Sequence, residues 1–376
     1  MTKATESSRQ LADLYRRPGS WTSVYVDVSD DVTNAKRASH QRSFRATLQD
    51  AGAPPADIDA VERLLDSPTG VGGPLCRFLL LRDGEVEVNE LLQGAPLLPE
   101  IASHGTVPEL LPLLRHRPLD LSYVVAEVGR DGGEIRLHRL GRIGPVSEES
   151  VVGRTDFLSK VQVGGWSQAR YQHHTEEIWK HNAGDLATVL DRIVLEHSVA
   201  LLLLSGDIRA RQLLAEQLSP AARGVLSTVN SHTRPDGAAD DDLVHRLAAE
   251  LDGILERHEA DALDRLAERE GQGDGLGITG LEGVVPALQQ AQVDTLLLCP
   301  DDLAERTLLA LDAEPWVAAH DGDTLTAGVL GEIPAASAMV RAAILTDAQV
   351  LLVDPKHVPG DVPVGATLRW PTAPAQ

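Results

Sequence analysis

SYVVAEVGRDGGEIRLHRLG, residues 122–141, alternates apolar and polar side chains on both sides of an Arg-Asp-Gly-Gly turn. A period of two is typical of a half-buried strand, so this stretch predicts two strands joined by a turn. A long helical pattern follows at 169–197, and VALLLLSG at 199–206 predicts a fully buried strand. The unit is completed by a helix and a short strand, at 209–218 and 225–230. Strands and helices in this order predict a mixed α/β domain over residues 118–237.

The connection inside this domain has no sustained period. It reads GPVSEESVVGRTDFLSKVQVGGWSQ (144–168), and with the start of the helix it makes a predicted loop at 144–170. A structureless connection of this length in a compact domain is usually functional or disordered. Two glycines permit close backbone approach, Trp166 can stack on a base, and Arg170 can pair with a phosphate. The alternative is an ordinary flexible loop with one Trp docked on the protein.

The residues before this domain predict a first α/β domain at 1–117. Helical patterns and strand patterns alternate here, and an Asp-Gly turn joins a strand pair at 76–92. The Pro-rich stretch 97–118 predicts an irregular connector. The helices are expected at 5–17, 34–52 and 56–67, and a further strand at 20–28.

Two more segments follow. Residues 238–270 hold eleven acidic residues and four arginines in a helical pattern, which predicts an acidic connecting helix. Residues 271–376 then predict a small α/β/α sandwich after a Gly-rich break. Its helices are expected at 279–291, 301–311 and 333–346, and its strands at 293–299, 349–354 and 364–370.

The amino-acid composition limits which class of protein this chain can belong to. The 376 residues are 43% hydrophobic but only 3% aromatic, so the cores must use Leu, Val, Ala and Ile. The polar N-terminus does not resemble a secretory signal, and the apolar runs are too short to span a bilayer. We therefore expect a soluble, cytoplasmic protein with no membrane partner. Cys76 and Cys299 lie in apolar runs and predict two reduced core cysteines.

The negative charge is unevenly distributed. The net charge of the chain is −22, but residues 1–50 have a balance of +2 and residues 1–237 of −5. The remaining −17 falls on residues 238–376. This asymmetry indicates that different parts of the chain face different partners.

The order of these units and several of their residues resemble the release factor–Pelota superfamily. The residues that carry the resemblance are VGGWSQARYQHHTEEIWKHNAGDLATVLDRIV (163–194), the buried strand VALLLLSGD, GLEGVVPALQQAQVDTLLL and the ending GATLRW. The resemblance implies a decoding-type first domain, an RNase H-like middle domain with a glycine-rich loop, and a C-terminal α/β/α sandwich. It covers about residues 120–376 and is similar to an actinobacterial branch, which includes the Balon group of ribosome hibernation factors and Vms–ANKZF-like factors.

The glycine loop departs from the release-factor pattern. In release factors a glutamine directly follows two glycines and faces the ester that joins peptide to tRNA. Here Trp166 and Ser167 separate Gly165 from Gln168, and two residues span as much as roughly 7 Å of extended chain. An amide is a poor general base, so Gln168 would only position water or stabilise charge. The resemblance nevertheless implies a peptidyl-transferase-centre loop made of Gly164, Gly165, Trp166, Ser167, Gln168, Ala169 and Arg170, with Gln168 as its catalytic candidate.

Basic residues supply the candidate rRNA contacts. Arg42 and Arg45 lie three apart on one face of the helix expected at 34–52. In the family this domain enters the decoding centre, where such a helix would meet phosphates; the alternative is a solvated helix face. The full set of candidates is Lys36, Arg37, Arg42, Arg45, Arg154, Lys160, His173 and His174.

Metal chemistry is the weaker interpretation of the remaining motifs. His174 and His181 share a helix face with Glu177, but a third well-spaced ligand is missing, so exposed helix histidines are favoured. A nuclease of the RNase H type would need several carboxylates on the strands, and the first strand offers only Glu127. No phosphate-loop motif is present. We expect neither a metal nor another cofactor.

The sequence leads to two ranked hypotheses. The first is a monomeric factor that occupies the ribosomal A site, contacts the rRNA of both subunits and protects idle ribosomes. Elongation factor Tu or another translational GTPase would bind its acidic C-terminal domain, and tRNA is a further candidate partner. A kink-turn RNA-binding role, known for related folds, conflicts with the charge of −10 over residues 271–376. The second hypothesis is a peptidyl-tRNA hydrolase that uses Gln168. A third and weaker one is a stress protein that acts away from ribosomes.

Overall fold

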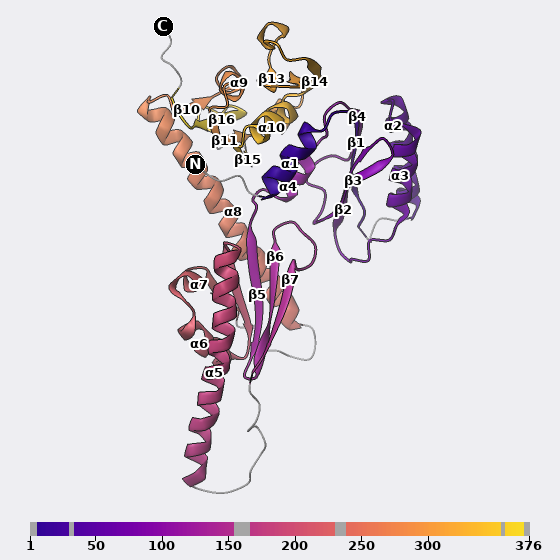
Figure 1. The fold of residues 1–376 in the computed structure, drawn as a ribbon. Helices are drawn as coiled ribbons and strands as arrows, with labels where there is room; N and C mark the ends of the chain where they lie inside the picture. The colour runs from indigo at the N-terminus through magenta and orange to yellow at the C-terminus, as the bar shows by residue number, and fades with distance from the viewer. Residues whose placement is uncertain (1–5, 30–33, 154–165, 230–237, 355–357, 372–376) are drawn as a thin grey trace. The chain divides into compact units, whose positions relative to one another are not determined.

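The computed structural model describes residues 6–29, 34–153, 166–229, 238–354 and 358–371. The chain divides into two compact units (Figure 1). One unit combines residues 1–119 with residues 256–376, and the other comprises residues 120–255.

The unit of residues 120–255 is built on a five-stranded sheet. Its order is β7-β6-β5-β8-β9, with β6 antiparallel to both neighbours and β8 parallel to both of its own. This order and these directions are those of an RNase H-like sheet, as the resemblance implies. The strands are β5 (Ser122–Gly129), β6 (Gly132–Arg139), β7 (Ser147–Val152), β8 (Leu201–Gly206) and β9 (Leu226–Thr228).

The strand β7 corrects the expectation for residues 144–168. No regular structure was expected there, yet Ser147–Val152 pairs with β6 along its whole length. The sequence SEESVV does not alternate, because β7 is an edge strand whose residues are exposed or half-exposed. Because neither face of β7 is buried, the strand needs no apolar period.

Helices α5 (Trp166–Glu196), α6 (Ile208–Gln217) and α7 (Pro220–Gly224) cover one face of this sheet. Leu186 and Leu190 of α5 are buried against strand residues such as Val124 and Leu202. The Leu- and Ala-rich composition therefore suffices for this core, as expected from the scarcity of aromatic residues.

The N-terminal part holds a four-stranded antiparallel sheet in the order β3-β2-β1-β4. Helices α2 (Asn34–Asp50) and α3 (Pro55–Asp66) pack on one face, while α1 (Glu6–Arg16) and α4 (Leu111–His116) contribute to the core on the other. At the expected Asp-Gly turn, Asp83 and Gly84 have φ of 53° and 84°, which fits a type I′ hairpin. The strands are β1 (Trp21–Asp27), β2 (Leu75–Arg82), β3 (Glu85–Gln93) and β4 (Ile101–Gly105).

The Pro-rich stretch 97–118 is more regular than expected. It contains β4, which pairs antiparallel with β1, and the short helix α4. The prolines fit this arrangement, because Pro112 lies in the first turn of α4, where an amide proton is not needed.

The C-terminal part is an α/β/α sandwich. Its sheet has the order β10-β16-β11-β15. Helices α9 (Leu281–Gln289) and α10 (Ala335–Leu345) share a core with one face, while Ala262 and Leu266 of α8 (Ala238–Gln272) pack on the other. The strands are β10 (Gly277–Thr279), β11 (Val293–Leu298), β15 (Gln349–Leu352) and β16 (Val364–Leu368).

A second, three-stranded sheet corrects another expectation. A helix was expected at 301–311, but only the short 3₁₀ turn η1 (Asp301–Leu303) forms, and residues 307–311 are a strand. The sheet contains β12 (Thr307–Leu311), β13 (Val317–Ala318) and β14 (Val329–Pro334), and a further 3₁₀ turn, η2 (Asp321–Asp323), precedes β14. Leu and Ala favour a helix locally, but pairing on both sides of β12 overrides that preference.

The N-terminal and C-terminal parts share one hydrophobic core. Tyr15 and Leu110 from the first part are buried in the same cluster as Met339 and Val340 of α10. The Ser337 hydroxyl also donates a 2.6 Å hydrogen bond to the Glu109 carboxylate. Among the described helices, none is both long and apolar enough to cross a membrane.

Candidate functional site

The long helix α5 is the most distinctive feature of the RNase H-like unit. Among its described side chains, Asn182 is the first that is fully buried, whereas Glu176 and Glu177 are exposed. Figure 1 shows that α5 extends beyond the end of the sheet. The backbone from 166 to 178 corresponds to about 20 Å of helix at 1.5 Å per residue. Its first residues therefore lie away from the core of this unit.

A cluster of side chains fixes α5 where it leaves the sheet. The Arg130 guanidinium, in the turn between β5 and β6, stacks over the Trp179 ring at 4.5 Å from its centroid. The Asn182 amide donates a 3.0 Å hydrogen bond to the Arg130 carbonyl oxygen. Gly153 lies so close that a Cβ there would stand 2.4 Å from Asn182 Cγ. Only glycine fits this position without displacing Asn182.

Asp207 connects this cluster to α6. Its carboxylate accepts hydrogen bonds from the amide of Ala210, at 2.9 Å, and from Arg130 Nε, at 3.1 Å. Burial raises the pKa of Asp207, but the amide hydrogen bonds and the Arg130 charge outweigh it and hold the pKa below its ordinary value. Asp207 thus acts as the N-cap of α6 and as the counter-ion of Arg130.

The predicted loop residues fall at and before the start of α5. The backbone of Trp166, Ser167, Gln168, Ala169 and Arg170 is helical, so the helix begins three residues earlier than the sequence pattern suggests. His173 and His174 also lie in α5, with side chains outside the description. The candidates outside the described residues altogether are Arg154, Lys160, Gly164 and Gly165. The roles assigned to all of them stay predictions.

The basic residues of α2 differ in their exposure and in their ion pairs. Arg42 is exposed, and the side chains of Lys36 and Arg37 lie outside the description. Arg45 instead forms an ion pair with Glu62 of α3. The hydrogen bond with Glu62 and its charge raise the pKa of Arg45. Arg45 therefore enters any contact with a phosphate already paired, which weakens it as a candidate.

The remaining motifs show ordinary surface geometry. His181 Nε2 lies 3.6 Å from the Asp185 carboxylate, one turn along α5, and both side chains are about half exposed. Glu127 is exposed on β5. The described residues contain no group of three His, Cys, Asp or Glu side chains arranged to hold a metal ion. Cys76 and Cys299 are buried free thiols, as expected, and burial raises the pKa of Cys299 to about 12.

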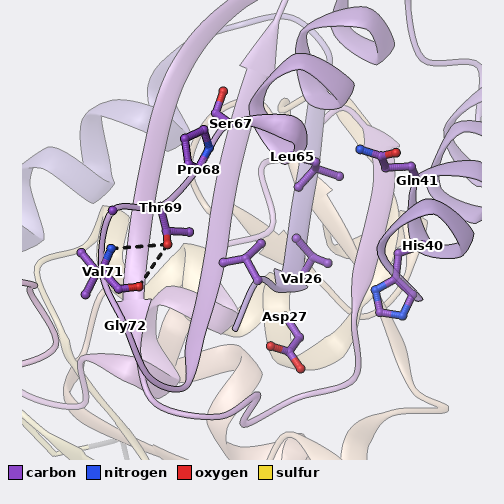
Figure 2. Close-up of a pocket in the computed structure, with 12 residues that line it drawn as sticks. Val26, Asp27, His40, Gln41, Leu65, Ser67, Pro68, Thr69, Val71 and Gly72 are labelled. Atoms are coloured by element: carbon purple, nitrogen blue, oxygen red, sulfur yellow. Dashed lines mark hydrogen bonds between the residues drawn. The ribbon is translucent and has the colours of Figure 1, made fainter. Parts of the chain in front are cut away.

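Sequence reasoning missed a cavity beside the N-terminal sheet. It has a volume of about 400 Å³ and lies between the end of β1, the helix α2 and the loop 67–72 that follows α3 (Figure 2). Its polar lining includes Asp27, His40 and Gln41. Asp27 is distant in sequence from His40 and Gln41, and only the packing of β1 against α2 brings it to the same cavity.

Comparison with known families agrees with this architecture. Residues 122–272, which span the five-stranded sheet and α8, match the model of "Bacterial archaeo-eukaryotic release factor family 2". The RNase H-like part of this chain is therefore a release-factor-type domain. It belongs to the bacterial branch of the release factor–Pelota superfamily.

Whole-chain relatives and solved structures are more distant. Two Mycobacterium tuberculosis proteins, "Uncharacterized protein MT2704" of strain CDC 1551 / Oshkosh and "Uncharacterized protein Rv2629" of strain H37Rv, are each 28% identical over 381 residues and cover 96% of both chains. Ribosome-bound archaeal Pelota, in a model with ABCE1, is 13% identical, with a TM-score of 0.41 and coverage of 99% of this chain and 96% of that one. Dom34 of S. cerevisiae, described as interacting with Hbs1, is 12% identical, with a TM-score of 0.37 and coverage of 80% and 81%.

Proposed function

We propose that this protein is a cytoplasmic, monomeric translation factor that occupies the ribosomal A site and protects idle ribosomes, as the Balon group does. The observation that carries the proposal is the release-factor-type domain at 122–272, whose helix α5 extends beyond its sheet. An extended tip is suited to enter a narrow site in rRNA, and Trp166 and Arg170 near its end can stack on a base and pair with a phosphate.

The state of Gln168 favours occupancy over hydrolysis. A release-type glutamine has to present its backbone amide and a water molecule to an ester. The Gln168 backbone is helical, and two residues separate it from the glycine pair. Catalysis loses about a hundredfold for an error near 1 Å, so this shift favours binding without cleavage. Occupation of the A site would then block tRNA entry and shield both active centres.

The charge distribution favours a protein partner for the C-terminal sandwich. Residues 271–376 carry a net charge of −10, which repels rRNA. We therefore assign rRNA contact to the first two domains and a translational GTPase, such as elongation factor Tu, to the third.

Pelleting through a sucrose cushion at physiological salt tests the proposal. Purified protein is added to vacant ribosomes and to ribosomes loaded with peptidyl-tRNA. We expect stoichiometric pelleting with vacant ribosomes and no release of peptide. Absence from both pellets would overturn the assignment to the ribosome and would favour a stress protein that acts elsewhere.

The alternative function is a peptidyl-tRNA hydrolase that rescues stalled ribosomes. Gln168→Ala separates the two functions, because it removes the side-chain amide and leaves a residue that favours the helix. On the proposed function, the variant pellets with ribosomes and protects them as the wild type does. If wild-type protein releases peptide from loaded ribosomes and the variant loses at least about a hundredfold of that rate while still binding, the hydrolase is correct. Glu177→Ala, at an exposed position of the same helix, is the control.

A further inference from the structure

Helix α5 contains a glycine close to the place where it leaves the sheet. Gly184 lies in the interior of this 31-residue helix, and glycine weakens a helix interior relative to alanine because it has more conformational freedom to lose. From position 172 to Gly184 the helical backbone spans about 18 Å at 1.5 Å per residue. A bend of about 20° at Gly184 would therefore displace position 172 by about 6 Å.

A close approach by α6 requires this glycine. The side-chain amide of Gln217, at the end of α6, donates a 2.7 Å hydrogen bond to the Lys180 carbonyl oxygen of α5. In a regular helix this oxygen accepts from the amide of Gly184, so Gln217 shares it. A Cβ at position 184 would stand only 2.9 Å from Gln217 Oε1. The docking of α6 on α5 thus introduces a point at which α5 can bend.

Arg130 restrains α5 on the tip side of Gly184. Its guanidinium stacks over the Trp179 ring at 4.5 Å from the centroid, and its carbonyl oxygen accepts a 3.0 Å hydrogen bond from Asn182. The Asp207 carboxylate of α6 in turn accepts from Arg130 Nε at 3.1 Å. We call Arg130, Trp179 and Asn182 the α5 clamp. It joins the β5–β6 turn to α5 between the tip and the glycine.

An exposed ion pair is the weaker restraint of this region. Glu176 of α5 pairs with Arg209 of α6, but their side chains are 48% and 43% exposed. Exposed ion pairs contribute little, because water screens them and two long side chains must be ordered. Trp179 is instead half-buried and packs against the core of the unit. A cation–π contact is stronger where it is partly desolvated, so the α5 clamp is the main restraint.

We propose that α5 is a lever with its hinge at Gly184, that the α5 clamp locks it in one direction, and that this lock raises the affinity for the ribosome. Arg130 and Trp179 are then positioning residues, which act through the first turns of α5 and need not touch RNA. A tip fixed in advance loses less conformational freedom on binding. The effect on affinity rests on the proposed function, whereas the lock is a property of the free protein.

A distance measurement between two spin labels tests the lock without ribosomes. The labels are attached at Gln172→Cys, in the helical backbone of the tip, and at Ser150→Cys, exposed on β7, while both native cysteines are buried. We expect one narrow distance distribution for the labelled protein. Trp179→Ala should broaden it by about 6 Å, the displacement that a bend of about 20° produces. An unchanged distribution would overturn the lock.

Ribosome pelleting then tests the effect on affinity. Trp179→Ala should bind vacant ribosomes about three- to thirtyfold more weakly than the wild type, the factor that corresponds to one cation–π contact. Trp179→Phe keeps an aromatic face for Arg130 and should bind within about threefold of the wild type. Leu195→Ala is the control, because this side chain is 79% exposed at the far end of α5. Equal binding by Trp179→Ala and the wild type would overturn the link to affinity. Absence of the wild type from the pellet would overturn the proposed function and this link, and only the lock would remain.

A second substitution separates positioning from direct contact with RNA. Gly184→Ala favours a straight helix, and its Cβ meets the flexible end of the Gln217 side chain. Added to Trp179→Ala, it should narrow the distance distribution and recover about four- to fivefold in affinity, the helix preference of alanine over glycine. A narrowed distribution without recovered affinity would overturn the positioning role. If Trp179→Ala lowers the melting temperature strongly, Arg130→Lys replaces it, because lysine keeps the charge beside Asp207 and loses the planar stack.

Discussion

The role of a single residue in this protein depends on the partner and the burial that the fold gives it. Arg45 reads as a basic helix residue free for rRNA, but Glu62, seventeen residues away on α3, pairs with it. Asp57 reads as one more acid at a helix start, yet it is fully buried. No sequence pattern identifies either partner, because both pairings depend on how α3 packs against its neighbours.

Asp57→Ala should destabilise the N-terminal sheet. Its carboxylate accepts 2.6 Å hydrogen bonds from the Thr22 hydroxyl and the Gly84 amide. Truncation leaves the buried Thr22 hydroxyl with His104 Nδ1, 3.0 Å away, as its remaining side-chain partner and removes the partner of the half-exposed Gly84 amide. We expect a loss of about 1–3 kcal/mol in total. Urea unfolding followed by circular dichroism measures the loss. The exposed neighbour in Asp59→Ala should change the free energy of unfolding by less than about 0.5 kcal/mol; similar losses in both variants would refute the burial argument.

Most secondary-structure elements that bury one face lie where the apolar pattern of the sequence predicts them. The hairpin at 122–141, the buried strand β8 and helix α10 appear where the apolar patterns predict them. Two of the exceptions are β7, which is exposed on an edge, and β12, whose Leu-rich sequence has no helix-breaking residue. Hydrophobic patterns in the sequence arise from burial. They therefore do not identify an exposed strand or a strand made of helix-favouring residues.

Gly153→Ala should loosen α5 where it leaves the sheet. A Cβ would lie 2.4 Å from Asn182 Cγ, so Asn182 must move and lose its hydrogen bond to the Arg130 carbonyl oxygen. Amide exchange of residues 176–186 should become faster by about two- to tenfold, equivalent to one hydrogen bond. Gly224→Ala in α7 is the control, because a Cβ there meets nothing within 4 Å. Unchanged exchange in Gly153→Ala would show that the contact does not restrain α5.

At the scale of the whole molecule, the ends of the chain form one unit. Glu109 from the N-terminal part and Ser337 from the C-terminal part share a hydrogen bond, and Tyr15 and Arg341 also face this region. Burial raises the pKa of Glu109, while the hydrogen bonds from Ser337 and the Leu111 amide lower it in part. The folded protein therefore keeps this proton at pH values where the unfolded chain has lost it.

Glu109→Gln should flatten the pH dependence of stability. In the wild type, the free energy of unfolding falls as the pH rises from the ordinary value of 4.5 to the raised pKa of Glu109, by up to about 1.4 kcal/mol per pH unit. The glutamine amide can still accept from Leu111 and donate to Ser337, so the variant loses this slope and becomes more stable than the wild type toward neutral pH. Urea unfolding across that range, with exposed Glu305→Gln as control, measures the difference. Parallel curves for wild type and Glu109→Gln would contradict the prediction.

The sequence by itself determined the α/β class, the RNase H-like middle domain, the acidic helix and the superfamily. The class and the acidic helix follow from period, length and composition, whereas the RNase H-like domain and the superfamily follow from the family resemblance that a few motif residues carry. All of these are local properties of the chain. Only the tertiary structure decided that Arg45 is paired, that the Gln168 backbone lies in a helix and that Asp27, His40 and Gln41 line one cavity. The physical reason is the same in each case: contacts between residues far apart in sequence depend on the packing of whole elements, and no local period encodes that packing.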